Sequence, residues 1–173
     1  MRRMGDDLLI RRFDSAVDSI SELTALLHRA YAGLAALGLR YVATWQDEEV
    51  TARRIDGAEC WVAERDGRII ATVTFRDHSQ PNDKAWYDRP DVAYFSQFGV
   101  EPDLQRGGVG SRLLDRIEAR AKELGAAELA LDTAVPATHL IRWYASRGYR
   151  EVGRESWDMT NYESVILSLR LAE

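Results

Sequence analysis

The chain has 173 residues, about the length of one ordinary domain, with 46% hydrophobic and 29% charged residues. This balance excludes an intrinsically disordered chain and predicts a single domain over residues 1–173. Its 23 Lys and Arg against 28 Asp and Glu give a net charge of −5, which disfavours nucleic acid as a partner.

Cysteine, histidine and hydropathy patterns exclude further classes. Cys60 is the single cysteine, so no internal disulfide framework can form. The three histidines, His28, His78 and His139, lack the spacing of a helical zinc site. No apolar run reaches the length of a membrane span, and the first residues turn acidic where a secretory signal would turn apolar. We expect a cytoplasmic protein with no metal and no membrane partner.

The first elements alternate between strand-like and helix-like patterns. Residues 8–13 are a plausible strand. A helix follows, with apolar residues at every third or fourth position and a stop at Gly38. Ser19 and Glu22 have the spacing of a capping box, although a start near Asp14 also fits the pattern.

A short helix and a hairpin are predicted next. Residues 47–55 carry acids in the first turn, where the helix dipole favours them. Strands over 59–64 and 69–75 flank Asp66-Gly67, which is typical of a two-residue hairpin turn. The polar stretch over 76–91, with two prolines, is predicted as a long loop that borders a binding site.

The second half alternates more regularly. The pattern predicts strands and helices in the order strand 92–100, helix 108–124, strand 128–133, helix 136–147, strand 149–157 and strand 164–171. The first four form a β-α-β-α unit, which implies parallel pairing of its two strands. The last two are expected to pair antiparallel. The fold class is therefore a mixed α/β domain.

The segment Phe98-Gly-Val-Glu-Pro-Asp-Leu-Gln-Arg-Gly-Gly-Val-Gly-Ser-Arg112 carries the most chemical information. Its glycines let the backbone approach a ligand closely, and the free N–H groups of the following helix face an anion such as a pyrophosphate. A tight connection without a ligand explains glycines before a helix equally well. A dinucleotide fingerprint needs a small residue where Leu113 stands, and no Gly-Lys-Ser/Thr triplet of a triphosphate loop exists.

Two linked motifs resemble those of the GCN5-related N-acetyltransferase (GNAT) family. Residues 105–110, Gln-Arg-Gly-Gly-Val-Gly, match the family's Q/R-x-x-G-x-G/A signature, and residues 98–102 stand in place of its strand end. Residues 143–149, Trp-Tyr-Ala-Ser-Arg-Gly-Tyr, resemble its aromatic-Tyr-x-x-x-Gly-Phe/Tyr segment at the expected distance. Two motifs at the proper separation are far more specific than either alone.

The resemblance implies a central mixed, mostly antiparallel, twisted sheet of about seven strands, with a parallel splayed pair in the middle and about four flanking helices. It implies acetyl transfer from acetyl-coenzyme A (acetyl-CoA) to a primary amine by direct attack, without a covalent enzyme intermediate. A non-catalytic acyl-CoA sensor and a nucleotide-binding protein remain as alternatives. Homodimers are frequent in the family.

Site residues follow from the same resemblance. Tyr144 matches the position that protonates the departing thiolate, and the Phe98 N–H is expected to face the thioester oxygen. The alternative role for Tyr144 is a core aromatic beside Trp143. Acetyl-CoA is expected at Phe98, Gly99, Val100, Gln105, Arg106, Gly107, Gly108, Val109, Gly110, Ser111 and Arg112.

The sequence departs from the family pattern at two positions. Tyr94 stands where some members carry a catalytic glutamate, and Ala137 where many carry a cofactor-binding asparagine. Glu101, between Val100 and Pro102, is expected at an exposed strand end. We therefore expect a water relay for the amine proton, and no residue is assigned as the base.

The acceptor site is expected among the variable segments. These contain aromatic and acidic residues suited to an amine cation: Tyr31, Tyr41, Trp45, Trp86, Tyr87, Asp47, Glu48, Asp83 and Asp88. Packed aromatics and solvated acids explain the same residues. A small-molecule amine is favoured as acceptor, with a protein lysine or N-terminus as the alternative.

Overall fold

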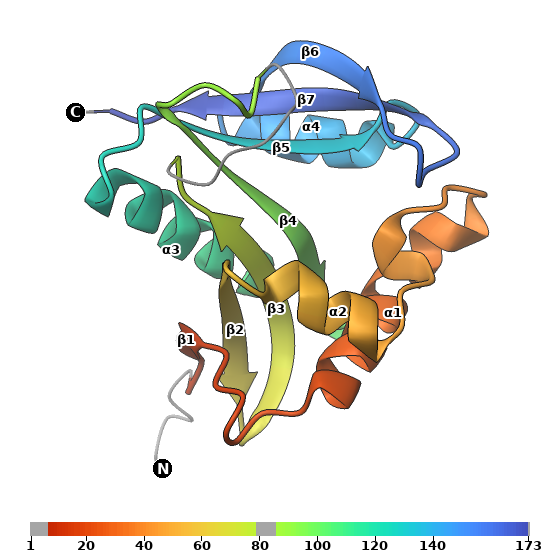
Figure 1. Cartoon of the computed structure of the whole chain (residues 1–173). Coiled ribbons are helices and arrows are strands. Elements are labelled where there is room, and N and C mark those ends of the chain that lie inside the picture. Colours follow the sequence, from red (N-terminus) through yellow and green to blue (C-terminus); the bar gives the residue numbers. More distant parts are fainter. Residues whose placement is uncertain (1–6, 79–85, 173) are drawn as a thin grey trace.

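A computed structural model describes residues 7–78 and 86–172 (Figure 1). Its strands form one sheet in the order β1-β2-β3-β4-β5-β7-β6. Their bounds are β1 Leu9–Arg12, β2 Glu59–Arg65, β3 Arg68–Arg76, β4 Val92–Val100, β5 Glu128–Ala134, β6 Arg150–Ser156 and β7 Glu163–Arg170. This agrees with the expected sheet in strand number, in its mixed pairing and in its central parallel pair.

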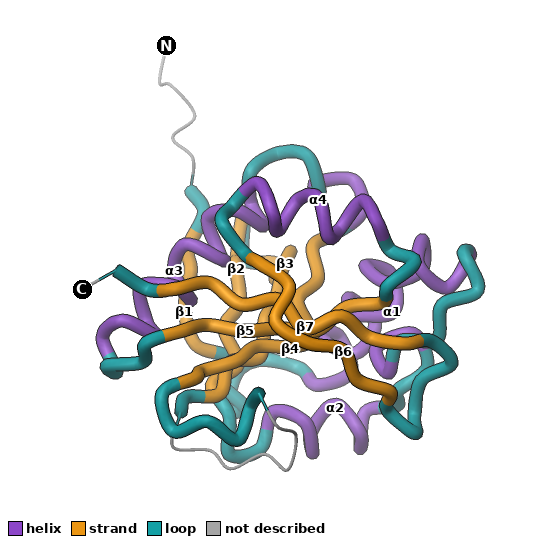
Figure 2. The backbone as a smooth tube through the Cα atoms, turned by 90° about the horizontal axis from the view of Figure 1, so that it is seen from above, coloured by secondary structure: helices purple, strands orange, loops and turns teal. Residues whose placement is uncertain are grey.

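Helices cover both faces of the sheet. The α-helices are α1 Ile20–Ala36, α2 Glu48–Ile55, α3 Val109–Glu123 and α4 Thr138–Ser146, and two 3₁₀ turns lie at Val42–Thr44 and Pro102–Leu104. Figure 2 shows α3 and α4 on one face of the sheet and α1 and α2 on the other.

Local sequence signals set the element boundaries. The Ser19 side chain caps α1 by accepting a hydrogen bond from the Glu22 N–H at 3.2 Å, so α1 begins at Ile20 and not near Asp14. Asp47 caps α2 in the same way. Asp66 and Gly67 both have positive φ, 52° and 74°, as the predicted β2–β3 hairpin turn requires.

The central parallel pair is short. β4 pairs with β5 only from Val92 to Tyr94, opposite Glu128 to Ala130, and beyond these residues the two strands diverge (Figure 1). β5 continues along β7 for its whole length. One edge of β4, from Phe95 onward, therefore has no strand partner among the described residues.

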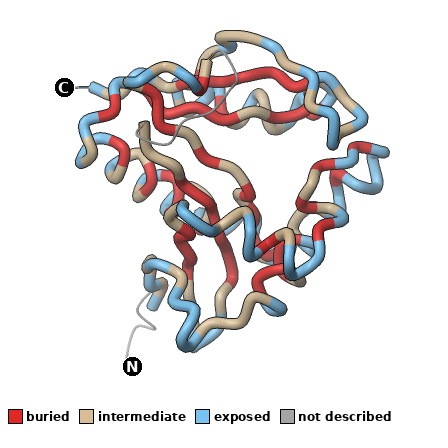
Figure 3. Tube along the Cα trace, in the orientation of Figure 1, coloured by how far each residue is buried: buried red, intermediate tan, exposed pale blue. Residues whose placement is uncertain are grey.

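The main core lies between the sheet and the helices α3 and α4. Helix α3 buries one face, made of Val109, Leu113, Leu114, Ile117 and Ala121. These side chains pack on inward residues of the central strands, such as Phe95 and Leu129. Figure 3 shows the buried residues concentrated in these strands. This packing fixes the N-terminus of α3 at the end of β4.

The predicted loop over 76–91 lies partly outside the described residues, which exclude 79–85. Strand β3 extends to Arg76, and Trp86 to Pro90 form turns that lead into β4. Helix α4 begins at Thr138, later than the predicted residue 136. The predicted helix 136–147 is otherwise confirmed.

Candidate active site

The glycine-rich turn leads directly into the N-terminus of α3. Gly108 is the N-cap residue and has a φ of 82°, a left-handed conformation that favours glycine. The first N–H groups of any helix lack intrahelical acceptors, and a glycine cap supplies no side-chain partner. The N–H groups from Gly108 to Ser111 thus form a donor set suited to phosphate oxygens. This fits the pyrophosphate of the expected ligand.

Gly110 keeps this helix end close to β4. A Cβ atom at Gly110 would lie 3.3 Å from Val100 Cγ2 and 3.4 Å from Phe98 Cζ. The donor set and the last residues of β4 are therefore in contact. Arg106 and Arg112, expected to neutralise phosphates, are both exposed at the same end of the molecule.

A bulge in β4 lies at the point where β4 and β5 diverge. Thr72 is paired with Gly99 and Thr74 with Ser96, so Gln97 and Phe98 together face one residue of β3. Gln97 has a φ of 51°, which is rare for a residue with a side chain. Bulges of this kind redirect backbone groups near active sites.

The Phe98 backbone lies near the Tyr31 hydroxyl. Burial raises the pKa of the Tyr31 hydroxyl, and a hydrogen bond from the Phe98 backbone offsets part of that rise. A thioester oxygen expected at this N–H would therefore lie beside the Tyr31 hydroxyl.

A buried amide network holds the bulge in place. The Gln97 side chain donates to Thr74 Oγ1 at 2.9 Å and accepts from Gln46 Nε2 at 2.8 Å. Gln46 also donates to Thr51 Oγ1 at 2.7 Å, and its side chain is fully buried. These bonds supply the partners that a buried amide requires, which stabilises the unusual Gln97 backbone. Sequence reasoning missed both glutamines, and nothing in the local pattern marks them.

Aromatic rings join the bulge to α4. The Phe98 ring stacks on Trp143, with centroids 6.0 Å apart, and Trp143 contacts Tyr144 edge-on at 5.0 Å. Phe95 contacts both Phe98 and Tyr144, at 6.0 and 6.3 Å. The two residues predicted to be catalytic, Phe98 and Tyr144, thus belong to one cluster.

Tyr144 is buried, with 5% of its surface exposed. No hydrogen bond to its hydroxyl is recorded among the described residues. Burial and the nearby Tyr31 and Tyr41 hold the pKa of Tyr144 well above its usual value of 10.0, against the lowering effect of Arg147. The phenol is therefore protonated at neutral pH, and its O–H lacks a recorded acceptor in the chain.

Glu101 is not at an exposed strand end, which corrects the sequence expectation. It is 7% exposed, and its carboxylate pairs with Arg29 of α1 and with Arg68, the latter at 3.2 Å. Its N–H continues the ladder by donating to Ile70 O at 2.8 Å. These two arginines neutralise the carboxylate, so Glu101 anchors α1 to the end of β4.

Aromatic residues on the α1 and α2 side lie near a half-buried acid, Asp132. Tyr31 and Tyr41 are in contact, with centroids 5.5 Å apart, and Tyr41 contacts Tyr162 at 4.8 Å. Asp132 of β5 accepts hydrogen bonds from Tyr87 at 2.8 Å and from Trp157 at 3.1 Å. Sequence reasoning missed Asp132, although an acid in the middle of the largely apolar strand Glu-Leu-Ala-Leu-Asp-Thr-Ala was a visible signal.

The other acidic candidates have structural or solvated positions. Asp47 caps α2, and Glu48 and Asp88 are exposed. Asp83 lies outside the described residues. Trp45 is 41% exposed, and Arg40 lies over its ring. Of the residues predicted for the acceptor site, Tyr31, Tyr41 and Tyr87 therefore remain candidates. Asp132, which was not predicted, is the acid that lies near them.

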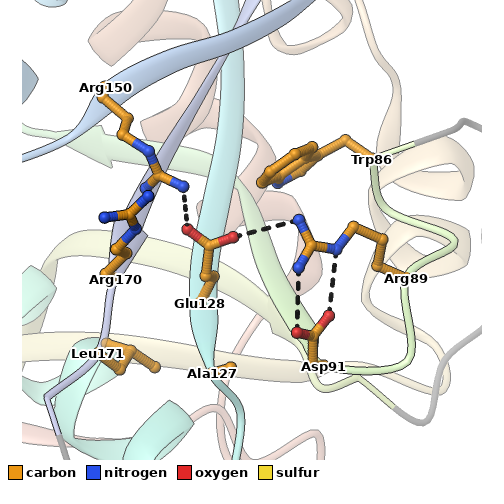
Figure 4. A pocket seen from close by; sticks show the side chains of 8 residues that line it. All are labelled: Trp86, Arg89, Asp91, Ala127, Glu128, Arg150, Arg170 and Leu171. Atoms are coloured by element: carbon orange, nitrogen blue, oxygen red, sulfur yellow. Dashed lines mark hydrogen bonds and ion pairs between the residues drawn. The ribbon is translucent and has the colours of Figure 1, made fainter.

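A surface pocket lies at the opposite end of β4 and β5, where the strands are still paired (Figure 4). Its volume is about 450 Å³. Arg89 and Arg150 extend into it toward Glu128, at 3.5 and 2.6 Å from the carboxylate. The Arg89 guanidinium also lies 4.3 Å from the Trp86 ring centroid. This pocket is separate from the residues of the glycine-rich turn.

Within residues 7–78 and 86–172, no group of three or more His, Cys, Asp or Glu side chains is placed to hold a metal ion. In the same part of the chain no helix has the length and apolar character needed to cross a bilayer.

Comparisons with known proteins identify the family of this chain. Residues 23–149 match the model of the acetyltransferase (GNAT) family. The chain is 33% identical to an S-(2-succino)cysteine N-acetyltransferase of Bacillus subtilis, over 83% of this chain and 87% of that protein. It is 29% identical to an S-alkylcysteine N-acetyltransferase of the same organism, over 78% and 75%.

The fold is also found among solved structures. The ribosomal-protein-S18-alanine N-acetyltransferase of Escherichia coli superposes with a TM-score of 0.72 over 96% of this chain and 95% of that one, at 18% identity. This likeness concerns the fold alone. The family match and the relatives show that the chain belongs to the GNAT family. It is an N-acetyltransferase whose acetyl donor is acetyl-CoA.

Proposed function

We propose that this GNAT acetyltransferase moves an acetyl group from acetyl-CoA to the primary amine of a small molecule, by direct attack of the amine on the thioester. One observation carries the proposal. The open edge of β4, the N-terminus of α3 and the aromatic cluster that contains Tyr144 lie together near the point where β4 and β5 diverge. A backbone donor, an anion site and an acid are the groups that thioester aminolysis needs.

The residues of the glycine-rich turn bind the donor in this proposal. The N–H groups from Arg106 to Ser111 hold the pyrophosphate, and the exposed Arg106 and Arg112 neutralise its charge. Gln105, Gly107 and Val109 complete the turn. The edge of β4 at Phe98, Gly99 and Val100 pairs with the extended pantetheine arm as an added strand would.

Phe98 and Tyr144 then act on the reacting atoms. The Phe98 N–H donates a hydrogen bond to the thioester oxygen as negative charge develops there. When the carbon–sulfur bond breaks, the Tyr144 hydroxyl gives its proton to the thiolate. The amine must release a proton to attack, and a water relay carries it away. Tyr94 cannot replace a carboxylate base in this step.

Relatives support a small acceptor. They are named for S-(2-succino)cysteine and S-alkylcysteine, both small amines, and they align over most of the chain. A protein lysine or N-terminus is the second candidate acceptor. A cytoplasmic location, a single domain over 1–173 and a possible homodimer stay predictions.

Thermal unfolding with acetyl-CoA, with ATP and NAD as controls, tests the donor site. A ligand at one hundred times its dissociation constant adds about 2.7 kcal/mol, or roughly 5 to 11 °C for a domain of this size. A shift specific to acetyl-CoA supports the proposal. No shift at millimolar acetyl-CoA overturns the donor site.

Thiol release with an amine panel tests the reaction. Release that depends on a small amine supports the enzyme as proposed. Tight acetyl-CoA binding with no release for any small amine or peptide would favour a non-catalytic acyl-CoA sensor. Release with peptides alone would move the acceptor to proteins.

A further inference from the structure

Within residues 7–78 and 86–172, Arg54 of α2 is a cation with no opposite charge in contact. The side chain is half-buried, and its partial desolvation lowers its pKa. Its one recorded hydrogen bond goes to the neutral Gln46 Oε1, at 2.7 Å. Among the described residues no ion pair of Arg54 is recorded. Its neighbour Arg53 is ordinary by contrast: its side chain is 68% exposed and lies 3.8 Å from Glu49.

Asp132 is the matching anion. Both oxygens accept from neutral donors, the Tyr87 hydroxyl and the Trp157 indole N–H. Burial raises its pKa. No cation contacts it among the residues that the structure describes. Both side chains are half-buried, and charges partly removed from water are normally paired, because desolvation penalises an uncompensated charge.

The two charges belong to one cluster. Each affects the pKa of the other, yet they form no recorded ion pair. Gln46 joins Arg54 to the bulge, because it accepts from Arg54 at 2.7 Å and donates to Gln97 at 2.8 Å. The cluster therefore adjoins the bulge at which the thioester is proposed to bind. Each charge is hydrogen-bonded to neutral partners, Arg54 to Gln46, and Asp132 to Tyr87 and Trp157.

We infer that Arg54 and Asp132 together select an α-amino acid as acceptor, with the acceptor's carboxylate on the Arg54 guanidinium and its ammonium group beside Asp132. This inference rests on the proposed function. A guanidinium matches a carboxylate in a two-pronged geometry, and a carboxylate among aromatic rings suits an ammonium ion. An α-amino acid supplies both missing counter-charges on one carbon atom.

Matched substrates and variants test the inference. S-methyl-L-cysteine is compared with 2-(methylthio)ethylamine, which lacks only the carboxylate, and further amino acids are compared with their decarboxylated amines. The wild type should favour the amino acids by 100-fold or more in kcat/KM. Arg54→Gln should lose most of this preference, mainly through KM for the amino acid. Arg54→Lys should restore part of it, and the control Arg53→Gln should leave it unchanged.

Asp132→Asn addresses the other charge. It should raise KM for amino acids and for amines alike by about tenfold or more, because both carry the ammonium group. Melting temperatures of each variant, with and without acetyl-CoA, separate loss of recognition from loss of folding. A folded Arg54→Gln protein that binds acetyl-CoA and keeps the wild-type preference would overturn the inference.

Two further outcomes separate the inference from the proposed function. Equal wild-type rates on amino acids and decarboxylated amines would refute acceptor selection while leaving the acetyltransfer in place. Thiol release with none of these acceptors, in a protein that binds acetyl-CoA, would refute the amino-acid acceptor. Absence of acetyl-CoA binding would refute the proposed donor site, and the inference with it.

Discussion

Strand β5 carries two acids on one face, Glu128 and Asp132, and the two acids have different kinds of partners. Glu128, where β4 and β5 are paired, is 7% exposed and lies against Arg89 and Arg150 (Figure 4). Among the described residues, Asp132, where the strands have diverged, accepts hydrogen bonds from the neutral donors Tyr87 and Trp157. At the paired end arginines in contact neutralise the acid, and at the divergent end neutral groups hold it.

This difference separates charges that hold the fold from charges kept for a ligand. A carboxylate that is paired with arginines of its own chain attracts a cationic substrate only weakly. A carboxylate held by neutral groups keeps its net charge, at a cost in stability, and perturbed groups of this kind cluster at functional sites. Substitutions at the paired end should therefore affect stability, and substitutions at the divergent end should affect activity.

The largest effect is expected from Tyr144→Phe. Removing the proposed proton donor should lower kcat by about 10²- to 10⁴-fold, the usual contribution of a general acid. The ring contacts with Phe95 and Trp143 remain, so the melting temperature and the Kd for acetyl-CoA should change little. Steady-state thiol release with calorimetric binding measures both. An unchanged kcat would instead leave Tyr144 as a core aromatic beside Trp143.

Glu128→Gln should show the opposite behaviour. It removes the charge that Arg89 and Arg150 share, and both arginine side chains remain more than a third exposed, so water takes over part of the loss. We expect unfolding to become easier by about 1.5 kcal/mol, or roughly 3 to 6 °C. kcat/KM measured below the melting range should stay within twofold. A tenfold loss would contradict the separation of the two ends.

Two glycines allow a matched comparison of strain and binding. Gly108 and Gly67 both have left-handed φ, 82° and 74°, and an added Cβ would meet no atom within 4 Å at either. Alanine at each position should cost about 1 kcal/mol of stability by denaturant unfolding. Only Gly108→Ala should also raise the Kd for acetyl-CoA. Equal Kd values for the two variants would remove Gly108 from the donor site.

The smallest effect concerns the pH dependence of stability. Because burial raises the pKa of Asp132, the folded protein holds that proton to higher pH than the unfolded chain. Its contribution therefore lowers the free energy of unfolding as pH rises between the two pKa values. Asp132→Asn removes this contribution, so the stability of the variant relative to wild type should rise with pH. Urea unfolding between about pH 4 and 7 measures the difference, and a flat or falling difference would contradict it.

Periodicity and turn chemistry predicted most of the fold. The hairpin at Asp66-Gly67, the capped start of α1 at Ser19 and the β4–α3–β5 unit all depend on local signals, and each is found. The GNAT resemblance predicted the sheet, and the family match confirms that membership. The roles of Tyr144, Phe98 and the glycine-rich turn stay predictions that the geometry supports.

Long-range contacts could not be predicted in the same way. Glu101 was expected to be exposed because a proline follows it, but its partners Arg29 and Arg68 come from α1 and β3. The bulge at Gln97 depends on Gln46, a residue distant in sequence and unmarked by any local motif. The proximity of Arg54 and Asp132 becomes visible only when α2 is packed on the face of the sheet that bears the Asp132 side chain.

The close approach of α1 to β4 at Gly99 also links the sizes of two distant residues. A Cβ at Gly99 would lie 2.9 Å from the Ala30 Cβ, closer than two such atoms can stand. Positions 30 and 99 therefore share one fixed volume, and a methyl group gained at one must be given up at the other. In a library that randomises both positions, alanine at 99 should survive selection mainly when glycine stands at 30. The two positions should therefore covary, although they are far apart in the sequence.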